Sequence, residues 1–483
     1  MSEITTRNGV VRGIDAGGVQ AYLGLRYAEA TTGERRFRPA VPAAPWQGVY
    51  DATRLPPRAP QPPGPALAGE VVGQVEDEDC LFLNVHTPGA DGTTRPVIVW
   101  IHGGAYTQGS ANDCDATKLA EQGVVVVCIN YRLGLLGFAD LSSLGPELAG
   151  SASNGFRDQV EALRWVRDNI ADYGGDPGNV TIMGESAGAG SVLGLLGAPA
   201  ADSLYHRAAV LSPAGFRREP SDAVPVLCAA LGVPEAELLD RLRALTCEEL
   251  LAVQEASGAP TTGVVDGTVV TRLFSEAIRS RGAAGVPVLA GTMRDEGTLL
   301  TEILDPSLHE LVATVIATQV TFGDDPTAYL TALRTAYPDA NATEIHELVW
   351  TDAFRRASIH AAEAATDAGP GGWLYRFDLP STALEGRLGA THGADLGFVF
   401  NTYNTDGDAP YLLHDRDDPA VRKLAEDWSS TLAAFARTGD PNGAGLPHWP
   451  RYGVDDRCCM VLDAESRLEP DLDARHQQLW GDA

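Results

Sequence analysis

Basic residues are scarce in this sequence of 483 residues, which has 36 Lys and Arg against 65 Asp and Glu and a net charge of −29. No block of Lys or Arg reverses that sign locally, and an acidic surface repels a phosphate backbone, which argues against a nucleic acid partner. Long apolar runs are absent as well. The longest stretch free of charged side chains, Pro96 to Asn112, contains His102 and several glycines, so no segment is expected to span a membrane.

Cysteine is sparse and follows no pattern. The seven cysteines are odd in number and show neither Cys-x-x-Cys spacing nor paired histidines nearby, which argues against a disulfide framework and against a zinc site. The first residues also lack the basic start and apolar run of a secretory signal. We therefore expect reduced, mostly buried thiols, no metal ion and a cytoplasmic protein.

The sequence does contain the alternating pattern of an α/β protein. Its composition, with 44% hydrophobic and 21% charged residues, is that of a folded globular chain. From Asn154 to Asp172 apolar residues recur every three or four positions, which predicts a helix. Five continuous apolar runs are typical of strands covered on both faces, and they lie at 97–101, 124–129, 180–183, 208–211 and 287–290. The alternation predicts a doubly wound, mostly parallel sheet with helices on both faces.

We expect a single domain over residues 1–483. Residues 220–285 and 305–370 are rich in Ala, Leu and Glu, which predicts helical insertions between strands and not a second domain. The Pro-rich tract 55–69 is interpreted as a surface loop, because the residues before it are too few for a separate core. The large negative charge opposes association, so we expect a monomer or a weak homodimer.

The most informative motif is Gly-x-Ser-x-Gly at 184–188, directly after one predicted strand and before the helical run 192–196. At a strand-to-helix elbow the serine adopts a strained backbone conformation, and small neighbours let other segments approach it closely. In a chain with 52 glycines the motif alone could be an ordinary turn. The strand before it and the helix after it favour Ser186 as a nucleophile.

A nucleophilic serine needs a base, and in this arrangement the base lies C-terminal to it. His392 is the best candidate, because the glycine-bracketed loop 389–393 can carry an imidazole into a cleft. His309, His346 and His360 lie in helical, charged surroundings, and we expect them to be exposed on helices.

The base in turn needs an acid, and the mechanism needs donors for an oxyanion. Asp295 and Glu296 both follow the run 287–290, and position alone leaves them equal. The loop 102–106, His-Gly-Gly-Ala-Tyr, contains small residues that leave its backbone N–H groups accessible. These N–H groups would act together with the N–H of Ala187. Protonation of the base would stop the reaction, so we expect activity to fall below about pH 6 to 7.

Together these motifs resemble the type B carboxylesterases, the cholinesterase-like branch of the α/β-hydrolases, and in particular its bacterial para-nitrobenzyl-esterase-like members. The resemblance extends over nearly the whole chain, since further segments are typical of the family: 22–28, 36–39, 78–85, 130–132, 435–442 and 449–452. It implies an α/β-hydrolase fold and hydrolysis of small-molecule carboxylic esters through an acyl-enzyme, with no cofactor.

The resemblance also implies roles for single residues. It makes Glu296, and not Asp295, the acid of the triad, with His392 as the base. It places three oxyanion donors at Gly104, Ala105 and Ala187. Its supporting positions beside the nucleophile correspond to Gly103, Glu185 and Ser212. Finally, it implies two structural ion pairs, Arg36 with Glu78 and Arg132 with Asp158.

The chain departs from the family pattern at three places. The family often pairs the cysteine at position 80, but the usual partner position holds Ala59, which is consistent with a reducing compartment. Ala105 stands where a third glycine is commonest and keeps the N–H. Pro213 stands where glycine is usual, and its fixed φ and missing N–H are expected to change the shape of the acyl pocket.

The substrate is less constrained than the reaction. In the family, the Gly-Gly-Ala-x loop accompanies a roomy site, so we expect aryl, benzyl or branched-alcohol esters, and the acidic surface favours neutral or cationic ones. Three alternatives stay open: an acyltransferase or tailoring hydrolase of secondary metabolism, an amidase or lactonase, and a catalytically inactive scaffold. The scaffold is disfavoured, because Ser186, Glu296 and His392 are all present.

Overall fold

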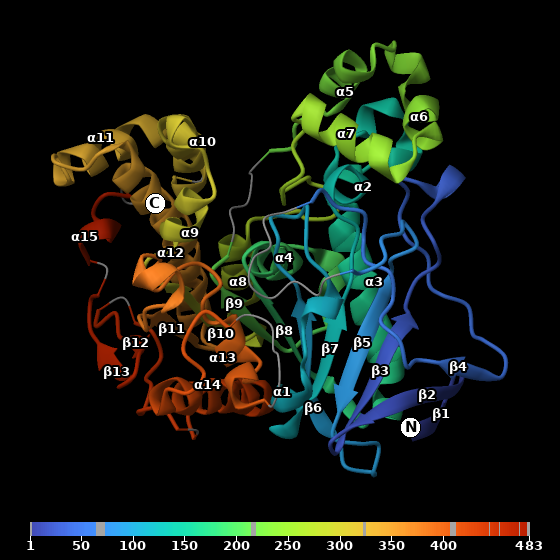
Figure 1. Ribbon diagram of the computed structural model, residues 1–483, viewed down its shortest axis with the longest axis horizontal. Coiled ribbons are helices and arrows are strands. Elements are labelled where there is room, and N and C mark those ends of the chain that lie inside the picture. Colours follow the sequence, from blue (N-terminus) through green and yellow to red (C-terminus); the bar gives the residue numbers. More distant parts are fainter. Residues whose placement is uncertain are drawn as a thin grey trace.

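A large twisted sheet runs through the molecule (Figure 1). The computed structural model describes residues 2–63, 73–213, 219–321, 325–405, 412–443, 445–453, 455–472 and 474–480. The strands are β1 (Ser2–Thr6), β2 (Gly9–Ala16), β3 (Val19–Arg26), β4 (Val49–Asp51), β5 (Phe82–Thr87), β6 (Arg95–Ile101), β7 (Val125–Ile129), β8 (Gly175–Glu185), β9 (Arg207–Leu211), β10 (Val288–Met293), β11 (Gly372–Phe377), β12 (Cys459–Leu462) and β13 (Arg467–Glu469).

The sheet is parallel in its centre and antiparallel at its edges. Its strand order is β1-β2-β3-β5-β7-β6-β8-β9-β10-β11-β12-β13, and β4 pairs with β2. Every pair from β7 to β12 is parallel, whereas β1, β2, β3 and β5 at one edge and β13 at the other pair antiparallel with their neighbours along this order. The five apolar runs form β6 to β10, which confirms the predicted mostly parallel sheet.

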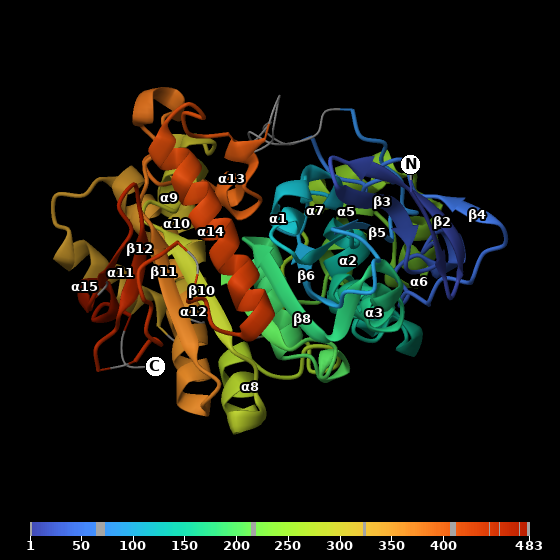
Figure 2. The same cartoon turned by 90° about the horizontal axis from the view of Figure 1, so that it is seen from below.

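Helices cover both faces of this sheet (Figure 2). They are α1 (Thr117–Glu121), α2 (Gly134–Phe138), α3 (Asn154–Asn169), α4 (Ala187–Leu196), α5 (Val224–Leu231), α6 (Glu235–Ala244), α7 (Cys247–Ser257), α8 (Phe274–Arg281), α9 (Gly297–Glu302), α10 (His309–Val320), α11 (Pro326–Ala336), α12 (Ala342–Ala368), α13 (Leu396–Val399), α14 (Pro419–Thr438) and α15 (Ala474–Gln477). The helix predicted from Asn154 is α3. In the described ranges, no helix combines the length and apolarity needed to cross a membrane.

Alternation along β6 shows how the two faces are filled. Val97, Val99 and Ile101 belong to the core that includes α3, α4, α8 and α12, whereas Ile98 and Trp100 belong to the core under α1, α13 and α14. Successive side chains of a strand point to opposite faces, so a strand that is apolar throughout requires a cover on each side.

Helices α5 to α7, from the chain between β9 and β10, and α9 to α11, from the chain between β10 and β11, lie beyond the carboxyl ends of the parallel strands (Figure 1). These two groups flank the sheet edge at which β8 and β10 end, where ligands bind in open α/β sheets.

Two ion pairs implied by the resemblance are present and buried. Arg36 bonds Glu78 through Nε and Nη2, and Arg132 bonds Asp158 in the same way. All four side chains are at most 7% exposed. Both expectations are confirmed.

The Pro-rich tract departs from expectation. Its first part is not a surface loop, because Pro56, Ala59, Pro60 and Gln61 are buried. The reason is a pair of hydrogen bonds: the Gln61 amide accepts from Gly109 N at 2.9 Å and donates to Gly109 O at 3.1 Å, which ties the tract to the loop after β6. Residues 64–69 of the tract lie outside the described residues.

Candidate active site

Ser186 occupies a sharp turn between β8 and α4. Its φ of 56° and ψ of −124° are strained for a residue with a side chain. The flanking glycines are required by packing, because a Cβ at Gly188 would lie 2.0 Å from the carbonyl oxygen of Ile101 and one at Gly184 would lie 2.8 Å from the same oxygen. The backbone of Ser186 is held by a hydrogen bond from its N–H to Leu211 O at 3.0 Å. This is the geometry predicted for a nucleophile elbow.

Glu296 faces His392. The Oε2 atom of Glu296 lies 2.6 Å from Nδ1 of His392, and its Oε1 accepts a hydrogen bond from Met293 N at 2.8 Å. The Glu296 side chain is fully buried. A carboxylate in this position fixes the imidazole tautomer that carries its proton on Nδ1, which leaves Nε2 as the basic atom.

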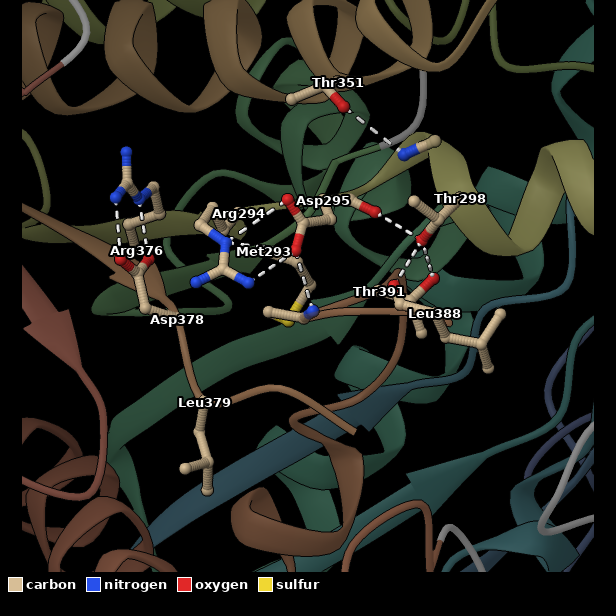
Figure 3. Close-up of polar contacts among 12 residues, drawn as sticks. Met293, Arg294, Asp295, Thr298, Thr351, Arg376, Asp378, Leu379, Leu388 and Thr391 are labelled. Atoms are coloured by element: carbon tan, nitrogen blue, oxygen red, sulfur yellow. Dashed lines mark hydrogen bonds and ion pairs between the residues drawn. The ribbon is translucent and has the colours of Figure 1, made fainter. Parts of the chain in front are cut away.

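Asp295, the neighbouring carboxylate, points elsewhere (Figure 3). It accepts hydrogen bonds from Ala390 N at 2.9 Å and from the Arg294 guanidinium at 2.8 Å, and its own N–H donates to Ala390 O at 2.9 Å. A Cβ at Gly389 would lie 2.3 Å from Oδ2 of Asp295, so the two segments touch with no room for a side chain. Asp295 thus joins the turn that carries Glu296 to the loop that carries His392.

A second contact reinforces this joint. The Thr298 hydroxyl lies 2.8 Å from Oγ1 of Thr391 and donates to Leu388 O at 2.6 Å (Figure 3). The N–H of Leu299 also donates to Oγ1 of Thr391, at 3.0 Å. The turn that carries Glu296 and the loop that carries His392 are therefore held together independently of the contact between these two residues.

A third carboxylate lies against the free edge of the imidazole. Oε1 of Glu185 is 3.2 Å from Nε2 of His392. The Ser186 hydroxyl makes no hydrogen bond to this nitrogen or to any other atom of the described residues. Burial raises the pKa of Glu185 to about 8. Burial by itself would lower the pKa of His392, but Glu185 and Glu296 outweigh it and raise that pKa to about 9.

Asp395 adds to this acidic environment. It is fully buried and accepts a hydrogen bond from the Tyr375 hydroxyl at 3.1 Å. Burial, together with the charge of Glu296, raises the pKa of Asp395 to about 7. Sequence reasoning missed both residues. A carboxylate three positions after His392 was the available signal for Asp395, and nothing marked Tyr375.

The loop after β6 lies beside Ser186. A Cβ at Gly103 would lie 3.1 Å from Cβ of Ser186, and Gly104 and Ala105 have φ values of 104° and 53°. Within the described ranges, the N–H groups of Gly104 and Ala105 have no protein acceptor. The N–H of Ala187, the first residue of α4, has no acceptor within its helix. Three backbone donors are thus available around the serine.

Ser212, the remaining predicted position, follows β9. It is fully buried, has a φ of 48°, and donates its N–H to Gly291 O at 2.8 Å. The structure places it one strand away from Ser186, where it links β9 to β10.

His309 and His346 are buried, so the expectation that they are exposed is wrong. They are 2% and 0% exposed, and their rings stack on each other with centroids 4.8 Å apart. They belong to α10 and α12, as predicted from their helical surroundings, but these two helices pack face to face. His360 is partly buried.

Sequence reasoning also missed Phe354 of α12. Its ring stacks on the imidazole of His392, with centroids 4.5 Å apart and planes at 26°. Residues 350 and 354 are aromatic and four positions apart, but nothing in the sequence related that pair to the active site. In the described part of the chain, no group of three or more His, Cys, Asp or Glu side chains is arranged to hold a metal ion.

Comparison with known proteins places this chain in one family. The model of the carboxylesterase family matches residues 1–480. The chain is 34% identical to the para-nitrobenzyl esterase of Bacillus subtilis, with 98% of this chain and 97% of that protein aligned. It is also 34% identical to the phenmedipham hydrolase of Pseudarthrobacter oxydans, over 93% and 92% of the two chains.

Solved structures of carboxylesterases support the same family assignment. A carboxylesterase of Geobacillus stearothermophilus superimposes with a TM-score of 0.86 and 36% identity over the full length of both chains. A thermophilic para-nitrobenzyl esterase superimposes with a TM-score of 0.87 and 30% identity, over 99% of this chain and 100% of that one. The chain therefore belongs to the carboxylesterase family, has the α/β-hydrolase fold and hydrolyses carboxylic esters as a serine esterase.

Proposed function

We propose that Ser186, His392 and Glu296 form the catalytic triad of this esterase. The observation that carries the proposal is the 2.6 Å contact between Glu296 and His392 beside a serine with strained backbone angles. An acid that fixes the base and a nucleophile presented on an elbow are the two elements that this chemistry requires.

The reaction proceeds in two half-reactions. The Ser186 oxygen attacks the ester carbonyl while its proton passes to Nε2 of His392, and Glu296 stabilises the resulting imidazolium. His392 returns that proton to the alcohol oxygen as the bond to the acyl carbon breaks. Water then repeats the sequence and releases the acid and the free serine. The serine and the base come into contact when substrate binds, since hydrogen bonds of this kind are often long in ligand-free enzymes.

The oxyanion is bound by the N–H groups of Gly104, Ala105 and Ala187 in this proposal. Their lack of a protein acceptor supports the assignment, because donors left open at a helix start and in a glycine loop are oriented before the charge develops. Gly103 supports the arrangement by its size, since the position of its missing Cβ is 3.1 Å from the serine Cβ.

Alanine in place of Ser186 tests the triad. We expect Ser186→Ala to lower kcat by several orders of magnitude and to abolish labelling by a fluorophosphonate probe, because the triad residues act as a unit. Ser430→Ala, a matched change on α14 away from the elbow, should retain both properties. A Ser186→Ala variant that keeps a tenth of the activity would exclude this serine as the nucleophile.

We further propose that the substrates are neutral esters with an aryl or bulky alcohol part. The net charge of −29 disfavours an anionic ester. The names of the bacterial relatives, one of them a para-nitrobenzyl esterase, are consistent with an aromatic alcohol. Phenyl butanoate and phenyl hemisuccinate form a matched pair. We expect kcat/KM to be at least about tenfold lower for the hemisuccinate at low salt, and an equal or higher value would contradict the proposal.

We also propose that the protein acts as a single domain in the cytoplasm, as a monomer or a weak homodimer. None of the seven cysteines, all of which lie within the described ranges, forms a disulfide, which suits a reducing compartment. Repulsion between acidic surfaces opposes self-association, so a homodimer should be weak. Cell fractionation and sedimentation at several concentrations test these two points, and a stable oligomer at nanomolar concentration would contradict the second.

A further inference from the structure

One turn of α12 contacts both loops of the proposed triad. Oγ1 of Thr351 accepts a hydrogen bond from Gly297 N at 3.3 Å, directly after the acid (Figure 3). Nη2 of Arg355 donates to Met293 O at 3.3 Å and to Arg294 O at 3.2 Å, three and two positions before the acid. Phe354, between these two residues, touches the base. A single helical turn therefore supports the acid and the base from the same side.

The contact between Phe354 and His392 covers a face of the imidazole. The ring centroids are 4.5 Å apart and the planes differ by 26°, so the rings stack face to face. Glu296 and Glu185 occupy the two nitrogen edges of the same imidazole. The carboxylates constrain rotation in the plane of the ring, whereas only a neighbour on the face constrains its tilt.

The Phe354 ring is itself held by a column of aromatic side chains. Trp350 stacks on it with centroids 5.6 Å apart and planes at 19°. The indole N–H of Trp350 donates to Nε2 of His346 at 3.0 Å, and His346 stacks on His309 of α10. Positions 346, 350 and 354 are four residues apart, so they share one face of α12. Phe354 is 2% exposed and has little room to move.

We propose that Phe354 is a positioning residue for the base: its ring holds the tilt of the His392 imidazole and, through its π face, stabilises the imidazolium that forms when the base takes the serine proton. A cation within about 6 Å of an aromatic centroid is attracted to the ring face. The inference rests on the proposed role of His392.

Other charged groups around His392 act together with this ring. Glu185 comes from the end of β8, Glu296 from the turn after β10, and Asp395 from the segment before α13; Tyr375 of β11 bonds Asp395. From α12, Arg355 contributes a positive charge beside the acid turn. Burial disfavours the charged imidazole, whereas the carboxylates favour it and raise the pKa. The π face of Phe354 acts in the same direction as the carboxylates.

Replacement by leucine separates the role of the ring from that of bulk. For Phe354→Leu we expect the acid limb of kcat/KM to move to lower pH by about 0.5 to 1 unit and kcat to fall by about tenfold. Phe354→Tyr keeps an aromatic face and should restore the limb to within about 0.2 units of the original protein. The matched control is Phe435→Leu, which removes a buried ring that packs on Trp373 of β11, and we expect it to leave the limb in place.

Fluorination tests the electrostatic part without changing shape. Pentafluorophenylalanine incorporated at position 354 keeps the ring but reverses its quadrupole, so we expect the limb to move in the same direction as in Phe354→Leu. This variant decides the matter if the leucine variant does not fold. An unchanged limb with the fluorinated ring, or an equal displacement in Phe435→Leu, would overturn the inference. Failure of the triad itself would instead show as retained activity in Ser186→Ala.

Discussion

Neutralising Asp158 provides a direct test of what holds the molecule together. Asp158 of α3 accepts three hydrogen bonds from Arg132, from its N–H at 3.1 Å, its Nε at 2.7 Å and its Nη2 at 2.7 Å. The two side chains are 0% and 2% exposed. Nη1 of Arg132 also donates to Arg38 O at 2.7 Å, so the guanidinium joins three segments.

The expected cost follows from burial. Asp158→Asn preserves shape but leaves a guanidinium in the interior without a counter-charge, which costs about 3 to 5 kcal/mol. For 483 residues the unfolding entropy is about 1 kcal/mol/K. The melting temperature should therefore fall by about 3 to 5 °C. Asp168→Asn is the matched control, because the Arg167–Asp168 pair is 51% and 50% exposed and such pairs contribute at most about 1 kcal/mol.

Differential scanning calorimetry at one scan rate measures both variants against the original protein. Activity at 20 °C should persist in Asp158→Asn, since the pair lies outside the proposed triad. If Asp158→Asn melts no lower than Asp168→Asn, then burial does not set the contribution of this ion pair and the reasoning is wrong.

Three further predictions concern the proposed site. Glu296→Gln removes the charge that stabilises the imidazolium, so kcat for a p-nitrophenyl ester should fall by about 10³ to 10⁴, whereas Asp295→Asn should keep at least a tenth of it; equal losses would refute the assignment of the acid. Because carboxylates raise the pKa of His392 to about 9, the neutral base forms only as pH rises through that value. The acid limb of kcat/KM, measured from pH 5 to 10, should lie above the ordinary 6.5, and a midpoint at or below 6.5 would contradict this. Ala105 has a φ of 53°, so Ala105→Gly should stabilise the protein by about 0.5 kcal/mol in urea unfolding, and a clear loss would be evidence against strain.

Much of the central sheet could be predicted from the sequence. A strand that is covered on both faces must be apolar throughout, and few other structures produce that pattern, so β6 to β10 were recognisable. The elbow was recognisable for a similar reason: a Cβ at either glycine of the motif would lie within 2.8 Å of the carbonyl oxygen of Ile101, so no larger residue fits.

The proposed acid could not be identified from position. Asp295 and Glu296 are neighbours in one turn, and only the packing of the base loop decides that Glu296 meets the imidazole while Asp295 bonds Ala390. The family resemblance favoured Glu296, and the contact with His392 agrees with it.

Long-range packing explains the other differences. His309 and His346 have charged neighbours in sequence, yet they lie between α10 and α12 because the two helices pack there. The pH limit of 6 to 7 predicted from the sequence used the ordinary pKa of histidine, because the contact of Glu185 with Nε2 of His392 depends on how β8 and the loop 389–393 meet in the fold. Phe354 lies 38 positions before the histidine on which it stacks, so no local pattern could reveal it.

The joint between Asp295 and Gly389 has a consequence for recombination. A Cβ at position 389 would lie 2.3 Å from the Asp295 carboxylate, so the two segments pack together only when their residues are matched. A chimaera with a relative whose crossover falls between residues 300 and 385 takes one segment from each parent. Crossovers outside that interval keep the pair from one parent. Functional chimaeras should therefore have few crossovers between the two segments. The turn and the loop should be inherited together, although α9 to α12 and β11 lie between them in the chain.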